Sequence, residues 1–126
     1  MLHLILFSWE NGFAANLEGP ANDNWRWCTS RGDLSVINNV PQTRRVEVTM
    51  CCKADNEVGA HMRINGDLWS EELLIGAGSQ PFTRTLTVPP GKHRLTFETD
   101  ARIIPGIDPR KLVWRVTRFS AQECGE

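Results

Sequence analysis

The 126-residue sequence predicts an all-β protein, an antiparallel two-sheet β-sandwich that is jelly-roll-like and has about nine strands. Three observations lead to this prediction. Helical periodicity is almost absent, turn-forming residues recur at short intervals, and segments between the turns alternate apolar and polar side chains. We expect a single domain over residues 1–126 with one core, because the chain is too short for two comfortable domains.

The first expected strands lie on both sides of a loop. Residues 2–8 are apolar but too short for a membrane span or a secretory signal, so they are expected to form a strand. An irregular strand is expected at 12–17. Residues 18–24 form a loop, since Gly, Pro, Asn and Asp favour turns. The next elements expected are a strand at 25–30, a turn at 31–33 and a strand at 34–38.

The middle of the chain has the clearest strand pattern. Apolar residues alternate with polar ones between 45 and 53, so one face of this strand should be buried. Asn65-Gly66 tolerates positive φ and predicts a tight hairpin between strands 58–64 and 67–75. The residues expected on the buried face of the strand at 45–53 are Val46, Val48, Met50 and Cys52.

The last strands follow a proline-rich turn. Pro89-Pro90-Gly91 presets the turn between strands 82–88 and 92–99. The final strand, 112–121, carries Trp114 on its apolar side, where it should lie in the core. Its alternation breaks at Phe119, which predicts a β-bulge near residues 117–118.

Composition excludes several classes of function. A formal net charge of −1 provides no broad positive field, so no nucleic-acid partner is expected. Without a signal peptide or membrane insertion in this chain, we expect a cytoplasmic location, although the chain could be a fragment of a larger protein. The four cysteines favour buried free thiols, with one bridge from Cys28 as the alternative; Cys51 and Cys52 should face opposite sides.

No metal or cofactor is expected. The three histidines are far apart in the sequence and lack the close spacing of a zinc site. Asp and Asn oxygens in the loops 22–24 and 55–57 leave calcium open as an alternative. Both loops are explained more simply as turns. Catalytic motifs such as Gly-x-Ser-x-Gly are absent, and Glu71 and Glu72 should point to opposite faces, so we expect a non-enzyme.

Tryptophans are the best binding candidates, because the chain has five of them and no tyrosine. Indoles stack on the apolar faces of sugars, whose hydroxyls need polar partners such as Arg and Asp. Trp69 follows the predicted hairpin among acidic residues and should be exposed. Trp25 should share a face with Trp27, with Arg26 on the other; whether the indole face is interior is left open. Trp9 is the third candidate.

Polar candidates lie near both ends of the chain. Asp108 and Arg110 flank a proline in a predicted loop, where they either clamp a ligand or tie the structure together. In the second case, which we favour, Arg110 pairs with Glu18 or Asp108. Together with Arg26, these residues complete the predicted ligand-binding set of Trp69, Trp25, Trp9, Arg26, Asp108, Arg110 and Glu18.

A family resemblance rests on two motifs. Gly12-Phe13, Leu17-Glu18 and Trp25-Arg26-Trp27 are followed near the other end by Asp108-Pro109-Arg110-x-Leu112-x-Trp114. This pattern resembles the small accessory β-sandwich modules attached to bacterial glycosyltransferases of surface polysaccharides. The resemblance implies a non-catalytic carbohydrate-associated module, with a glycan or polysaccharide and possibly a glycosyltransferase domain as partners. The alternative is a structural or protein-docking module without a glycan ligand. The signature positions are Gly12, Phe13, Glu18, Arg26, Trp27, Asp108, Arg110 and Leu112.

Overall fold

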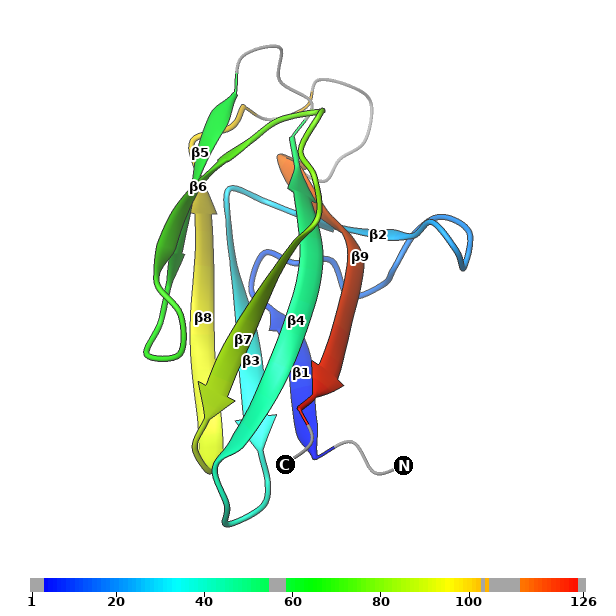
Figure 1. Ribbon diagram of the computed structural model, residues 1–126. Coiled ribbons are helices and arrows are strands. Elements are labelled where there is room, and N and C mark those ends of the chain that lie inside the picture. Colours follow the sequence, from blue (N-terminus) through cyan, green and yellow to red (C-terminus); the bar gives the residue numbers. More distant parts are fainter. Residues whose placement is uncertain (1–3, 55–58, 103, 105–111, 125–126) are drawn as a thin grey trace.

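Two antiparallel sheets face each other in the protein, for which we describe a computed structural model over residues 4–54, 59–102, 104 and 112–124 (Figure 1). These residues form nine strands and no helix, which confirms the predicted fold class. The strands are β1 (Ile5–Glu10), β2 (Trp25–Cys28), β3 (Arg31–Asn38), β4 (Arg44–Lys53), β5 (Ala60–Asn65), β6 (Glu71–Ile75), β7 (Phe82–Val88), β8 (Gly91–Thr99) and β9 (Trp114–Glu123).

Each edge of one sheet lies next to an edge of the other sheet. One sheet has the order β1-β3-β8-β5-β6 and the other β2-β9-β4-β7. Aromatic rings link β1 to β9 across the sandwich, since Phe7 and Phe119 meet at 5.3 Å. At the other side an ion pair joins Glu71 on β6 to Arg84 on β7. The sandwich therefore has a β1/β2 edge and a β6/β7 edge.

The core lies between the sheets and follows the predicted alternation. Val46, Val48, Met50 and Cys52 on β4 are all buried, as expected. Trp114 is fully buried and contacts Phe97 and Phe13, so the core is held by aromatic rings from three segments of the chain.

The predicted bulge in β9 is confirmed. Thr49 on β4 is opposite Ser120, whereas Cys51 is opposite Thr117. Over this stretch β9 therefore contains one residue more than β4, which is a β-bulge. Arg118 takes the extra position with a φ of 55°. The insertion returns Phe119 to the side that faces the other sheet, where it meets the ring of Trp9.

Three local expectations were wrong. Residues 31–33 belong to β3 and are not a turn. Residues 12–17 are not a strand and make an isolated bridge at Phe13, because Asn11 and Gly12, with φ of 39° and 102°, turn the chain away from β1. The β5–β6 hairpin is confirmed, but its loop is not tight. β5 ends at Asn65 and β6 begins only at Glu71, and Trp69 in the loop between them packs in the core.

Three of the cysteines are buried free thiols, as expected: Cys28, Cys51 and Cys52. Burial raises the pKa of Cys52, whose side chain faces the core. Cys51 faces the other way, also as expected, but it is not exposed. Its Sγ lies 3.2 Å from the carbonyl oxygen of Ser79, so the loop after β6 covers it.

Gly32 provides a test of the close packing behind β2. A Cβ at this position would lie 2.5 Å from Cys28 Sγ and 2.7 Å from a Phe13 ring carbon. We expect Gly32→Ala to lower the free energy of unfolding by about 1–3 kcal/mol, because a buried site without space is overpacked. Chemical denaturation measures this. The control is Gly76→Ala, where a Cβ meets nothing within 4 Å; equal losses in both variants would contradict the packing described.

Candidate functional site

Four of the predicted site residues come together at the β1/β2 edge. The segment before β2 folds back along it: Glu18 and Trp25 exchange backbone hydrogen bonds of 2.9 Å in both directions. Trp9 lies at the end of β1, and Arg26 of β2 reaches its ring. The loop that joins these strands projects from the side of the sandwich beside β2 (Figure 1).

The register of β2 decides which side chains face the other sheet. Arg26 is opposite Val116 of β9, which is buried in the core, so Arg26 shares its side. Trp25 and Trp27 therefore lie on the outer side of β2. The alternative left open by the sequence, an interior or an exterior indole face, is settled in favour of the exterior.

Arg26 is held by two contacts. Its guanidinium carbon lies 5.3 Å from the centroid of the Trp9 ring, a cation–π arrangement, and its Nη1 donates a 2.5 Å hydrogen bond to the carbonyl oxygen of Ala14. Burial lowers the pKa of Arg26, although an arginine remains charged. Its Nε is enclosed and has no hydrogen-bond partner.

A hollow of about 140 Å³ opens beside this arginine. Its walls are mainly apolar, and one of them, Leu17, is 54% exposed. Phe119 contributes a half-buried ring that also contacts Trp9, with centroids 4.9 Å apart. The hollow thus combines one cation, one amide and several apolar surfaces. The lining residues are Trp9, Leu17, Asn24, Arg26, Val116 and Phe119.

The outer indoles are partly covered. Gly19 lies so close to Trp25 that a Cβ there would stand 2.3 Å from a ring carbon, and its φ is +89°, which favours glycine. Arg115 lies over the ring of Trp27 at 5.3 Å. Both indoles are half-buried, so each offers part of its surface rather than an open face.

Trp69 corrects the expectation of an exposed ring. It is 8% exposed and contacts Phe82 and Phe97 in the core. Its Nε1 donates to Glu71 Oε1 at 2.9 Å, and Arg84 meets both oxygens of that carboxylate at 2.8 and 2.6 Å. Acidic neighbours indicated an exposed surface, yet the half-buried Glu71 serves as the hydrogen-bond partner that an inward indole requires.

The remaining two candidates, Asp108 and Arg110, lie outside the described residues, and so does the predicted tie between Arg110 and Glu18.

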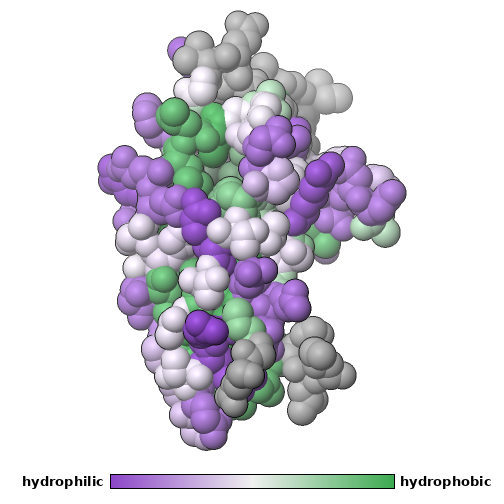
Figure 2. Space-filling model, viewed as in Figure 1, coloured by the Kyte–Doolittle hydropathy of each residue, from purple (hydrophilic) through white to green (hydrophobic). Residues whose placement is uncertain are grey.

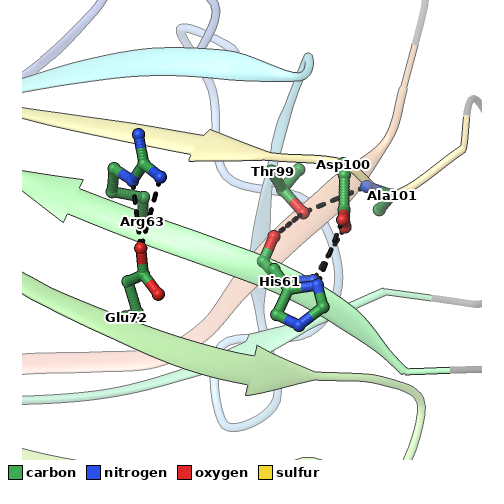
Figure 3. A network of polar contacts seen from close by, with 6 residues as sticks. All are labelled: His61, Arg63, Glu72, Thr99, Asp100 and Ala101. Atoms are coloured by element: carbon green, nitrogen blue, oxygen red, sulfur yellow. Dashed lines mark hydrogen bonds and ion pairs between the residues drawn. The ribbon is translucent and has the colours of Figure 1, made fainter.

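A second hollow, of about 400 Å³, lies on the outer face of the five-stranded sheet. Figure 3 shows the polar contacts among its residues. Two cross-strand pairs line it. Arg63 contacts Glu72 at 3.3 Å, and His61 Nδ1 lies 3.1 Å from Asp100 Oδ2. Sequence reasoning missed it, because its charges come from three strands whose register was unknown. Arg63 pairs with Glu72, and the lining also carries the carboxylates of Glu98 and Asp100. The lining residues are His61, Met62, Arg63, Glu72, Glu98, Thr99 and Asp100.

The surface view shows small hydrophobic areas separated by polar side chains (Figure 2). Among the described residues, the exposed large hydrophobic side chains are Leu6 on β1, Leu17 between β1 and β2, and Leu74 on β6. Within the same residues no group of three His, Cys, Asp or Glu side chains is placed to hold a metal ion. No helix able to span a membrane occurs in this part of the chain.

No protein-family model and no curated protein matches the chain. Solved structures do. A CBM4 carbohydrate-binding module aligns with a TM-score of 0.51 and 10% identity over 94% of this chain and 86% of its own. The N-terminal cellulose-binding domain of β-1,4-glucanase C from Cellulomonas fimi aligns with a TM-score of 0.51 and 7% identity over 95% and 90%. At these identities the likeness establishes the fold: the chain has the β-sandwich of these modules.

The Trp69–Glu71–Arg84 cluster predicts a pH dependence of stability. Hydrogen bonds from Arg84 and Trp69 lower the pKa of Glu71 to about 2 from an ordinary value of 4.5. A carboxylate with a lowered pKa stabilises the fold above pH 4.5, and this contribution is lost as the pH falls toward 2. We expect Glu71→Gln to cost about 1–2 kcal/mol at pH 7, with the difference from wild type vanishing near pH 2.

Thermal unfolding between pH 2 and 7 tests this expectation. The control is Glu72→Gln, whose partner Arg63 is exposed and whose loss should have little effect. A pH-independent loss in Glu71→Gln, or a matching loss in the control, would show that the cluster does not act through this carboxylate.

Proposed function

We propose that the protein is a non-catalytic carbohydrate-binding module and that its glycan lies in the hollow at the β1/β2 edge. The observation that carries this proposal is the guanidinium of Arg26, stacked on Trp9 and bordering an apolar hollow. The CBM4 and cellulose-binding β-sandwiches that share this fold support the same function.

The chemistry of the hollow suits a sugar ring. Saccharides combine apolar C–H surfaces with hydroxyl groups that need donors and acceptors. Leu17 and Phe119 offer apolar surface, and Arg26 offers N–H donors. Asn24 uses its Nδ2 to hold the carbonyl oxygen of Ala21, which orients its amide at the rim. Trp9 contributes mainly by positioning Arg26, since one ring face meets that cation.

A pair of carboxylates that face each other across β1 and β3 supports the non-catalytic part of the proposal. Glu10 and Asp33 are cross-strand partners. The hydrogen bond from Ser35 is the main cause that lowers the pKa of Glu10. Burial would raise the pKa of Asp33, but hydrogen bonds from Asn11 and Thr96 outweigh it and lower the pKa. Glycoside hydrolysis needs one carboxylic acid with a raised pKa, and neither group meets this need.

We further propose that the module serves a bacterial surface-polysaccharide pathway beside a glycosyltransferase. The motif residues of the resemblance support this context, because those near the N-terminus converge here. Phe13 bridges to Cys28, Glu18 bridges to Trp25, and Arg26 lies between the sheets. Of the motif residues, Leu17 and Arg26 line the hollow, while the backbone bridges of Phe13 and Glu18 hold the surrounding segment in place.

Binding to a glycan array of bacterial polysaccharides tests the function. Hits are then titrated by tryptophan fluorescence, for which Trp9 is a reporter at the hollow. We expect the double variant Leu17→Ala/Asn24→Ala to bind about tenfold more weakly, about 1.4 kcal/mol, because apolar contact and an amide are both lost. The control is Arg63→Ala in the hollow on the outer face of the sheet.

Two outcomes would contradict the proposal. The first is that no polysaccharide on the array binds the protein, which would leave a structural or docking module. The second is that binding persists in the double variant and is lost in Arg63→Ala, which would place the glycan on the outer face of the five-stranded sheet.

A further inference from the structure

We infer that the hollow selects acidic saccharides, with the carboxylate of a hexuronic acid received by Arg26. This inference rests on the proposed function and adds the substrate class. It starts from the charge of Arg26. Among the described residues no carboxylate forms an ion pair with Arg26, which instead contacts one carbonyl oxygen and one indole. Burial of a charge without a paired charge is unfavourable, so an anion supplied by a ligand would complete the site.

Arg84 shows how a guanidinium paired with a carboxylate is held in this protein. Arg84 binds both oxygens of Glu71, and hydrogen bonding to Glu71 is the main cause that raises the pKa of Arg84. Arg26 behaves in the opposite way: burial lowers its pKa and no carboxylate compensates. An added carboxylate at Arg26 would therefore restore the pairing that Arg84 already has.

The geometry leaves one side of Arg26 for a ligand. Nη1 is engaged by Ala14, and Nε is enclosed by the protein. Within the part of the chain that the structure describes, Nη2 has no hydrogen-bond partner, so it is the donor left to serve the hollow that Arg26 lines. Trp9 holds the guanidinium plane in place, which reduces the entropy lost when a ligand binds.

The walls of the hollow strengthen the attraction. Leu17, Val116 and Phe119 place apolar surface beside the cation, and Coulomb attraction is stronger where the local dielectric constant is lower. The volume of about 140 Å³ admits a carboxylate and the adjoining edge of a sugar ring. A formal net charge of −1 gives no general attraction for polyanions, so selection of an acid must arise at this site.

Matched ligand pairs test the inference. Oligomers of galacturonate, glucuronate and mannuronate are each compared with their methyl esters, which keep the ring and remove the charge. We expect at least one acid to bind tenfold or more tightly than its ester, with affinity falling as salt is raised. Arg26→Gln should abolish this preference, and Arg26→Lys should keep part of it. Arg63→Gln should leave it unchanged.

Each other result has a distinct meaning. If every ester binds as well as its acid, or Arg26→Gln retains the preference while its circular dichroism and melting temperature match wild type, the acidic specificity is overturned. The proposed function then still stands if neutral glycans bind at the hollow. If no saccharide of either kind binds to the folded protein, the proposed function itself fails.

Discussion

The direction in which Arg26 points is the constraint on which the candidate site depends. Because it pairs with Val116 in the β2–β9 register, its long side chain enters the space between the sheets and not the solvent. There it meets Trp9 from the opposite sheet and the backbone of Ala14. A shift of β2 by one residue would turn Arg26 outward and both neighbouring indoles inward, and the cationic hollow would not exist.

Aromatic contacts make that arrangement possible. Phe13 touches Trp9, Phe97 and Trp114, so one ring links the turn after β1 to both sheets. Phe119 reaches the same cluster because the bulge in β9 returns it to the inner side. At the β6/β7 edge the sandwich is instead closed by Trp69, Glu71 and Arg84. One edge is thus closed by a cation paired with a carboxylate, whereas at the other no carboxylate of the described residues pairs with Arg26.

The sequence predicts the strands well where alternation or turn chemistry is strong. The pattern of β4, the Pro89-Pro90-Gly91 turn and the bulge at Arg118 are confirmed. It placed Trp114 in the core correctly but could not place Trp25, Trp27 or Trp69, because the side on which a strand's residues fall depends on register with partners distant in the chain. The prediction that Trp69 is exposed was wrong for a related reason. Its acidic neighbours indicated a solvent-exposed position, whereas Glu71 is bound by Arg84, thirteen residues later in the chain.

The candidate site was predicted in part for the same reasons. Motif spacing brought Trp9, Glu18, Trp25 and Arg26 to attention, and they lie at one edge. The stacking surfaces expected of the indoles are largely occupied by Arg26, Gly19 and the core. What remains for a ligand is a smaller hollow with a charged wall, which the sequence did not indicate.

Chemical-shift mapping of the isotope-labelled protein during titration with a polysaccharide that it binds is the most direct measurement of where the glycan lies. The account predicts that the indole N–H of Trp9, the side-chain amide of Asn24 and the guanidinium of Arg26 shift together at the β1/β2 edge. Shifts concentrated at His61, Arg63 and Thr99, with the signals of Trp9 and Arg26 unmoved, would contradict it.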